Sequence, residues 1–311
     1  MQKITITGGA GFIGSHLCKY WISRNFQVTV IDNLRSGFEK NLSGLNNVTL
    51  IKESITSRAE VFKAVNGSKY VFNMAAMISV PESMTNPFEC VNINVNGLIN
   101  ILDAAKEYGV EKVIHSSSAA IYGEDPELPK TTSMRPNPKS PYGITKLDGE
   151  YYLNMYSDFY GLKTTSLRYF NVFGPGQDPK SQYAAAIPIF VYKALNNEDI
   201  TIYGDGEQTR DFVFVEDVVQ ANVLAAESSI PKGVYNVANG KTITIKQLAQ
   251  LIIEYTNSKS KILFAPERAG DIKHSLASID NTVAELGFSP KCNLEDGLKS
   301  TVDYFIGIMK K

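Results

Sequence analysis

Three glycines at a spacing of three follow the first apolar run of the chain. The run Ile4–Ile6 leads into the segment Thr7–Gly14, and a helical pattern continues from there. Gly8 permits a tight turn, Gly11 lets backbone N–H groups approach an anion without an intervening Cβ, and Gly14 allows the helix to pack closely on the strand. The N-terminus of the helix attracts negative charge through its unpaired N–H groups and its dipole. We therefore predict a strand–turn–helix unit that binds a phosphate group.

A second strand-like run, Val28–Ile31, ends in an acidic residue. This residue, Asp32, stands 24 residues after Gly8, close to the roughly 20 expected for the carboxylate that binds an adenosine ribose. A carboxylate in that place accepts hydrogen bonds from the ribose 2′-hydroxyl and repels a 2′-phosphate. The sequence thus predicts NAD rather than NADP as cofactor. Arg35 lies nearby and is a cation that would weaken the rejection of NADP.

Short apolar runs alternate with longer helical patterns through the first half of the chain. The runs that we interpret as strands are residues 3–7, 27–31, 48–51, 69–74, 111–116 and 163–168. Helical patterns cover residues 15–24, 58–66 and 91–108. Regular alternation of this kind is typical of a parallel sheet with helices on both faces. We predict an α/β fold of the Rossmann type with a doubly wound parallel sheet.

The composition changes after Arg168 toward glycine, proline, asparagine and aspartate, which indicates a smaller, loop-rich substrate lobe. Phe212–Ala226 returns to a strand-then-helix pattern. We therefore predict a discontinuous division of the chain. A Rossmann domain comprises residues 1–168 and about 212–240, and the C-terminal lobe comprises about 169–211 and 241–311.

Charge and composition argue against several other classes of protein. The 311 residues contain 31 basic and 32 acidic side chains without a basic block, so we expect no nucleic-acid or membrane-surface partner. No apolar run approaches 18 residues and no export signal begins the chain, so we expect no membrane span. Cys18, Cys90 and Cys292 are few and widely spaced, which fits a reducing cytoplasm. The three histidines are scattered, and we expect no metal site.

Polar residues that could carry chemistry stand on both sides of a Pro- and Lys-rich loop, Glu124–Pro141. Ser118 follows a predicted strand, and Tyr142 and Lys146 open the next helix with a spacing of four that places them on one face. An ammonium group and a positive nicotinamide ring beside Tyr142 would lower its pKa, which makes it a candidate general base. Ser118 would bond the reacting hydroxyl. Taken alone, the Tyr142–Lys146 pair would be an ordinary surface contact, but the glycine turn and the serine strand end favour catalysis.

Together these motifs resemble the extended short-chain dehydrogenases/reductases, and within them the UDP-galactose and UDP-N-acetylglucosamine 4-epimerases. The resemblance covers nearly the whole chain and includes Asp32–Leu34, Asn94–Gly97, Arg168–Pro175, Gln208–Phe212 and Arg268–Asp271. It implies that tightly held NAD is used and regenerated within one turnover. Tyr142 would take the proton from O4 of a UDP-sugar while a hydride leaves C4. The 4-keto sugar would then turn over and receive the hydride on its other face.

The resemblance also implies the residues that bind each ligand. The implied cofactor-binding residues are Gly8, Gly11, Phe12, Ile13, Gly14, Asp32, Asn33, Ser54, Ile55, Ala75, Asn94, Ser116, Tyr142, Lys146 and Tyr169. The implied substrate-binding residues are Ser118, Tyr142, Asn171, Arg210, Arg268, Asp271 and Ser275. Lys146 would bind the nicotinamide ribose and keep Tyr142 acidic. Arg210 and Arg268 suit a pyrophosphate because arginine is permanently charged and binds in a bidentate manner, although either could instead be a surface ion-pair residue.

Departures from related enzymes narrow the expected chemistry. Dehydratases and decarboxylases of this family have acidic residues directly after the serine, where this chain has Ala119 and Ala120. The resemblance therefore favours epimerisation at C4. Segment 73–76, Ile78 and the pair Ser54 and Ile55 differ from the usual pattern, which affects the details of NAD binding.

Ser275 occupies the position where a bulky tyrosine in related enzymes excludes an acetamido group. The resemblance thus implies interconversion of UDP-GlcNAc and UDP-GalNAc, with UDP-Glc and UDP-Gal also accepted. Alternatives are an enzyme restricted to non-acetylated sugars, a UDP-uronic acid 4-epimerase, a net oxidoreductase that releases NADH, and a non-catalytic NAD-sensing protein. An alternative interpretation of Ser275 is that it is only a polar turn residue and does not select the sugar. Apolar residues in 91–108 and 142–160 favour a homodimer.

Overall fold

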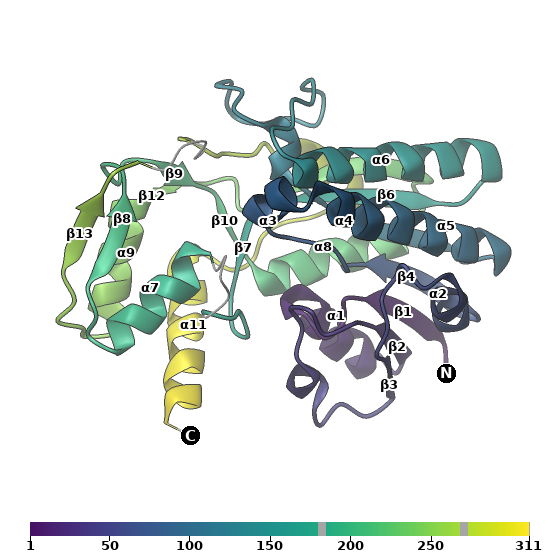
Figure 1. The fold of residues 1–311 in the computed structure, drawn as a ribbon, viewed down its shortest axis with the longest axis horizontal. Helices are drawn as coiled ribbons and strands as arrows, with labels where there is room; N and C mark the ends of the chain where they lie inside the picture. The colour runs from purple at the N-terminus through teal and green to yellow at the C-terminus, as the bar shows by residue number, and fades with distance from the viewer. Residues whose placement is uncertain (180–184, 268–272, 311) are drawn as a thin grey trace.

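A seven-stranded parallel sheet forms the centre of the computed structural model, which describes residues 1–179, 185–267 and 273–310 (Figure 1). The strand order is β11-β6-β5-β4-β1-β2-β3, and every neighbouring pair is parallel. The strands are β1 (Lys3–Thr7), β2 (Gln27–Ile31), β3 (Val48–Ile51), β4 (Ser68–Asn73), β5 (Lys112–Ser118), β6 (Thr164–Tyr169) and β11 (Lys232–Val237). The six predicted strands are confirmed within two residues at each end. β11 lies outside the predicted ranges.

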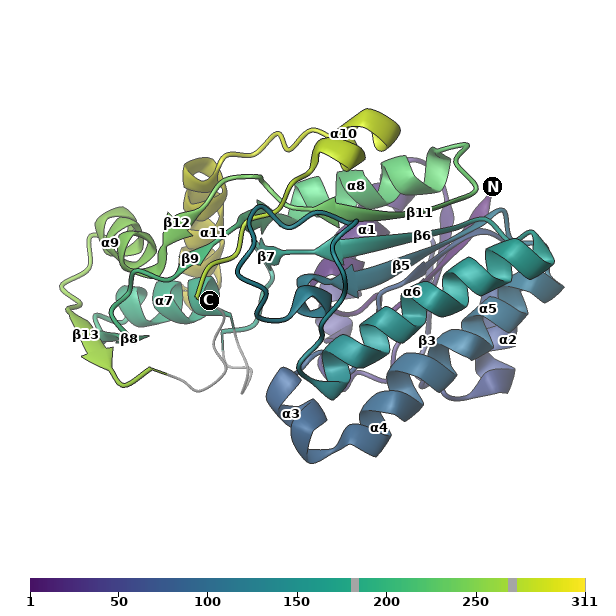
Figure 2. The same cartoon turned by 90° about the horizontal axis from the view of Figure 1, so that it is seen from above.

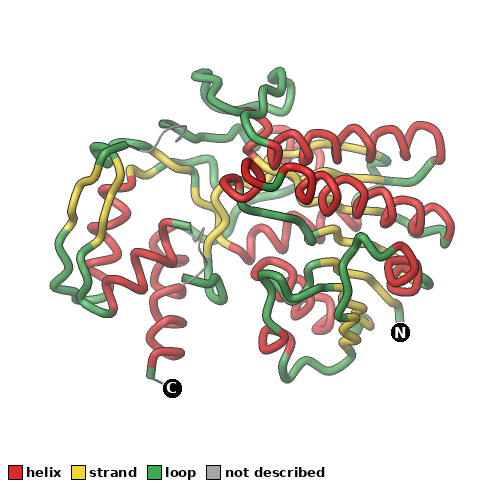
Figure 3. The backbone as a smooth tube through the Cα atoms, in the orientation of Figure 1, coloured by secondary structure: helices red, strands yellow, loops and turns green. Residues whose placement is uncertain are grey.

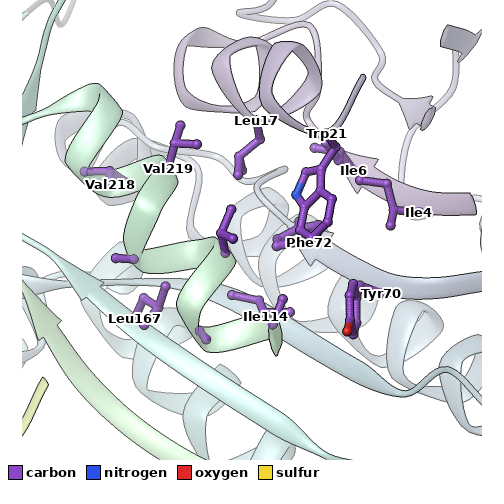
Figure 4. Packing of buried hydrophobic residues seen from close by; sticks show 14 of the residues in the cluster. Ile4, Ile6, Leu17, Trp21, Tyr70, Phe72, Ile114, Leu167, Val218 and Val219 are labelled. Carbon is purple, nitrogen blue, oxygen red and sulfur yellow. The ribbon is translucent and has the colours of Figure 1, made fainter. Parts of the chain in front are cut away.

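Helices cover both faces of this sheet (Figure 2). On one face lie α1 (Phe12–Ser23) and α8 (Val215–Glu227), and on the other lie α2 (Arg58–Val65), α5 (Gly97–Glu107) and α6 (Pro141–Tyr160). Figure 4 shows the apolar packing between the first pair of helices and the strands, where α1 contributes Leu17 and Trp21 and α8 contributes Val218 and Val219. The Rossmann-type fold predicted from the alternating pattern is confirmed.

The predicted helix over residues 91–108 is confirmed, but it contains a π-helical turn that was not predicted, so that three helical segments follow one another without a break. These are α4 (Pro87–Val91), a π-helical turn (Asn92–Asn96) and α5. The extra residue in the π turn accompanies the inward position of Asn94, whose Oδ1 accepts a hydrogen bond of 2.8 Å from the N–H of Met77. A short helix, α3 (Val80–Thr85), precedes these pieces.

The remaining elements form a smaller group beside the sheet, on the left in Figure 1 and drawn with short separate strands in Figure 3. Its paired strands are β7 (Asn171–Phe173) with β10 (Phe212–Phe214), β8 (Ile200–Tyr203) with β13 (Ile262–Ala265), and β9 (Thr209–Arg210) with β12 (Ile243–Thr244). Its helices are α7 (Ala186–Leu195), α9 (Ile245–Tyr255) and α11 (Leu294–Met309), which enclose an apolar core.

Two segments connect this group with the large sheet. The expected return of the chain at Phe212 gives β10, which pairs with β7 rather than with the seven-stranded sheet, and then α8, which packs on that sheet. Later in the chain, α10 (Asp280–Leu286) packs against β11 and α8. Leu286 and Phe288 consequently belong to the apolar core that α1 and α8 form with the large sheet. Within the described ranges, every helix is too short or too polar to pass through a lipid bilayer.

Candidate active site

The glycine turn connects β1 to α1 as predicted. Gly8 has a φ of +66°, and a Cβ there would lie 2.7 Å from the backbone nitrogen of Ala75. A Cβ on Gly14 would lie 2.2 Å from the carbonyl oxygen of Gly8. Within the described residues no side chain caps α1 and no acidic residue lies in its first turn. The first N–H groups of α1 have no partner within the helix itself and are available to an anion.

A cavity of about 640 Å³ opens at the carboxyl ends of the strands, where parallel sheets bind ligands. Of the residues predicted to bind the cofactor, those that line it are Gly8, Gly11, Phe12, Ile13, Gly14, Asp32, Asn33, Ser54, Ile55, Ala75, Ser116, Tyr142, Lys146 and Tyr169. An uncapped helix start at one part of the wall and a buried carboxylate at another match the pyrophosphate and the ribose of a dinucleotide. The described residues therefore fit NAD.

Asp32 is held in place by two backbone N–H groups. Its Oδ2 accepts a hydrogen bond of 2.9 Å from Ala10, and its Oδ1 accepts one of 2.8 Å from Leu34. Each carboxylate oxygen keeps acceptor capacity for a ribose hydroxyl. The guanidinium of Arg35 pairs with Glu82 at 2.5 Å and with Glu89 at 3.5 Å. These two carboxylates compensate the cation that would otherwise attract a 2′-phosphate.

Asn94 takes part in a buried network and is not among the described residues that line the cavity. Its Nδ2 donates hydrogen bonds of 3.2 Å to the carbonyl oxygen of Met77 and 3.0 Å to Oγ1 of Thr145. Oγ1 of Thr145 in turn donates to the carbonyl oxygen of Tyr142 at 2.9 Å. The side chain thus joins the π turn to the start of α6. Contact between Asn94 and the cofactor stays a prediction.

Ser118, Tyr142 and Lys146 meet at one wall of the cavity. Ser118 ends β5, and its Oγ accepts a hydrogen bond of 3.1 Å from the N–H of Ala120. Tyr142 and Lys146 stand on the first turns of α6, which begins after Ser140, whose Oγ accepts a hydrogen bond from Gly143. The Nζ atom of Lys146 lies 5.7 Å from the centroid of the Tyr142 ring. A hydroxyl, a phenol and an ammonium group are therefore available to one ligand.

The expected lowering of the Tyr142 pKa is not found in the protein itself. Burial raises the pKa of Tyr142, and the hydroxyl of Ser118 opposes this rise. Burial also lowers the pKa of Lys146 to about 8. The ammonium group donates to the carbonyl oxygen of Ser116 at 2.7 Å. The prediction also relied on a positive nicotinamide ring beside the phenol, so that part of the lowering would have to come from a bound cofactor.

A buried ion pair behind this wall was not predicted from the sequence. Glu150 accepts hydrogen bonds from Nε and Nη2 of Arg168 at 2.9 and 2.8 Å and from Oγ of Ser117 at 2.6 Å. The carboxylate therefore joins α6 to β6 and β5. The available signal was the position of Glu150 four residues after Lys146, on the same face of the helix.

A second cavity of about 510 Å³ lies in the smaller group and shares Val172 and Ala185 with the first. Two predicted substrate-binding residues, Asn171 and Arg210, line it. Ser275 lies beside β9, where its N–H donates to the carbonyl oxygen of Thr209 at 3.1 Å. The predicted residues Arg268 and Asp271 lie outside the described residues.

The sequence profile of the NAD dependent epimerase/dehydratase family matches residues 4–238. This chain belongs to that family. It is 43% identical to a UDP-N-acetylglucosamine 4-epimerase from Methanobrevibacter ruminantium M1, solved with UDP-N-acetylmuramic acid, over 99% of each chain with a TM-score of 0.95. It is 40% identical to a UDP-glucose 4-epimerase from Thermotoga maritima, solved with UDP-glucose, over 99% of this chain and 100% of that chain with a TM-score of 0.95.

A UDP-glucose 4-epimerase from Thermus thermophilus, solved with NAD, is 35% identical. The match covers 98% of this chain and 99% of that chain, with a TM-score of 0.90. The family and these relatives confirm the predicted cofactor, NAD. They also confirm the predicted enzyme class, an NAD-dependent UDP-sugar 4-epimerase.

Proposed function

We propose that the enzyme interconverts UDP-GlcNAc and UDP-GalNAc by inversion at C4 and also accepts UDP-Glc and UDP-Gal. The observation that carries the proposal is the meeting of Ser118, Tyr142 and Lys146 at the wall of the larger cavity, with Ala119 and Ala120 directly after the serine. Alanines supply no further acid or base for elimination or decarboxylation. A small Ser275 beside β9 supports room for an acetamido group, and one relative is a UDP-N-acetylglucosamine 4-epimerase.

In this mechanism the residues of the chain hold the sugar hydroxyl and move its proton. Tyr142, as phenolate, takes the proton from O4, and Ser118 keeps O4 within reach by a hydrogen bond. Lys146 keeps a positive charge beside the phenolate and so favours its formation. NAD, when bound, supplies the acceptor and later the donor of the C4 hydride. Arg210 and Asn171 hold the UDP part while the 4-keto sugar turns over, and Tyr142 returns the proton at the end.

A coupled assay with three substrates tests this proposal. Purified enzyme is given UDP-Gal, UDP-GalNAc or UDP-galacturonate, and formation of the 4-epimer is measured. We expect turnover of the first two and little of the third. Turnover of UDP-Gal alone would instead support an epimerase restricted to non-acetylated sugars, and preference for UDP-galacturonate would support a uronic acid 4-epimerase.

We also propose that the chain is divided by ligand. Residues 1–168 and about 212–240 bind NAD, and about 169–211 and 241–311 bind the UDP-sugar. The lining of the two cavities supports this division, because the larger is lined mostly by the first part and the other by the second. One helix of the second part, α10, is an exception, because it packs on the large sheet of the first part.

A homodimer formed through the helices at the outer face of the sheet is a further part of the proposal. Phe88 on α4 is 84% exposed, and Phe159 and Tyr151 on α6 are 79% and 59% exposed. Figure 2 shows both helices along one side of the molecule. Light scattering should give about twice the chain mass of 34.3 kDa, and a monomer would contradict this part. A cytoplasmic location is supported by three free cysteines.

A further inference from the structure

Asp211 is a fully buried carboxylate that binds backbone groups from two distant segments. It lies between β9 and β10, and its exposed fraction is 0%. Its Oδ1 accepts a hydrogen bond of 2.9 Å from the N–H of Asn239, and its Oδ2 accepts bonds of 3.1 and 3.2 Å from Gly240 and Ala277. One side chain therefore satisfies donors from the loop after β11 and from the segment 273–278.

The backbone around Asp211 belongs to the second cavity. Its carbonyl oxygen accepts hydrogen bonds from the N–H of Asn171 at 3.2 Å and from Nδ2 of the same residue at 2.9 Å. The residues on either side of it, Arg210 and Phe212, line the cavity together with Asn171. The side chain of Asp211 points away from solvent, so it acts on the cavity through its neighbours and not by touching a ligand.

The segment 273–278 is the second structure that the carboxylate holds. Ser275 belongs to it, and its N–H donates to the carbonyl oxygen of Thr209. Two residues later, Ala277 donates to Asp211. Ser275 is thus fixed beside β9 by one backbone bond of its own and by one carboxylate bond nearby.

We propose that Asp211 is a positioning residue for the UDP-sugar, which holds Arg210, Asn171 and Ser275 in a fixed relation before the substrate binds. The inference rests on the proposed function. A carboxylate suits this task because its two oxygens accept about four hydrogen bonds and donate none. An amide would place an N–H group against at least one of the three backbone donors, and a buried donor without an acceptor is unfavourable.

A matched pair of variants tests the inference. Asp217 in α8 is also buried and accepts backbone hydrogen bonds, from Lys291 at 2.8 Å and from Cys292 at 3.2 Å, and it is not among the described residues that line either cavity. Asp211→Asn and Asp217→Asn are compared with the wild type at pH 8. The measurements are the Kd for UDP by calorimetry, the NAD content, KM and kcat for UDP-GalNAc, and the urea midpoint.

We expect Asp211→Asn to raise both the Kd for UDP and the KM by about tenfold or more. Its kcat and its NAD content should remain close to those of the wild type, because Ser118, Tyr142 and Lys146 are unchanged. Asp217→Asn should lower the urea midpoint to a similar degree and leave the Kd for UDP unchanged. A merely structural role for Asp211 would give the same result for both variants.

Two results would overturn the inference alone: UDP binding by Asp211→Asn equal to that of the wild type, or an equal loss in Asp217→Asn. A wild-type enzyme that binds no UDP and epimerises no UDP-sugar would contradict the proposed function and, with it, the inference. Hydrogen exchange of the unmodified enzyme without UDP provides a test that needs no variant. The amides of Asn239, Gly240 and Ala277 should be protected from exchange. Rapid exchange at these three amides would contradict the claim that their hydrogen bonds to Asp211 exist before the substrate binds.

Discussion

The ammonium group of Lys146 donates a hydrogen bond of 2.7 Å to the backbone carbonyl oxygen of Ser116. This bond fastens the start of α6 to the carboxyl end of β5. The phenol of Tyr142 and the hydroxyl of Ser118 come from the same two elements, so the bond also fixes the distance between them. A change in any one of these side chains should therefore lower the rate of catalysis.

Removal of the phenol hydroxyl should nearly abolish turnover. In Tyr142→Phe the ring remains while the proton acceptor is lost, and loss of a general base typically lowers kcat by about 10²–10⁴-fold. The measurement is kcat with UDP-Gal, together with the NAD content of the purified variant. NAD content should match the wild type, which shows that the cavity is intact. Unchanged epimerisation would mean that Tyr142 is not the base.

Burial of the Lys146 ammonium should make the stability of the wild type depend on alkaline pH. The pKa is about 8 in the folded protein against 10.5 for an ordinary lysine, so the unfolded chain binds more protons between these values. The cost of burial is present below pH 8 and disappears as the pH rises toward 10.5.

Urea unfolding of the wild type and of Lys146→Met at pH 7 and pH 9.5 measures this cost. The free energy of unfolding of the wild type should rise relative to that of the variant by about 2 kcal/mol between the two pH values. The control is Lys112→Met. Lys112 is also buried with a pKa of about 8, and its ammonium donates to the carbonyl oxygens of Ser228 and Ile230. The wild type should show the same rise in the free energy of unfolding relative to Lys112→Met, and this variant should keep its activity. If the difference in the free energy of unfolding between the wild type and Lys146→Met is the same at both pH values, the pKa of Lys146 is not lowered by burial.

The Glu150–Arg168 pair should contribute strongly to stability. Glu150→Gln leaves the buried guanidinium without a counter-charge, and breaking such a pair typically costs about 3–5 kcal/mol. The control is Glu60→Gln, which breaks an exposed pair with Lys63 at 3.3 Å and should cost less than about 1 kcal/mol. Urea midpoints of both variants give the comparison. Equal midpoints would show that the buried pair does not hold α6 on the sheet.

Much of the fold follows from local patterns, whereas the details of the site depend on tertiary packing. Apolar runs and the glycine turn are enough to predict six strands and α1. The strands are recognisable because a strand that is buried on both faces of the sheet is a nearly continuous run of apolar residues. The strand β11, with the sequence of Lys232–Val237, has weaker apolar character and becomes a strand through its pairing with β6. The π turn at Asn94 and the pair of Glu150 with Arg168 involve partners far apart in the chain, which periodicity cannot reveal.

A bulky residue at position 275 should separate the two classes of substrate. If Ser275 leaves room for the C2 substituent, Ser275→Tyr should abolish turnover of UDP-GalNAc and preserve that of UDP-Gal. The measurement is kcat/KM for both sugars, with Ser275→Ala as a control that should keep both activities. Equal loss of both activities in the tyrosine variant would remove the argument that this position selects the sugar.

The central claim is that the enzyme uses its bound NAD and regenerates it within each turnover. The most direct test mixes purified enzyme with UDP-GalNAc and no added cofactor, and follows epimer formation together with absorbance of the reduced nicotinamide. NAD should survive purification, and the epimer should form over many turnovers without accumulation of NADH. NADH that accumulates in step with product, or full activity in protein that contains no NAD, would contradict it.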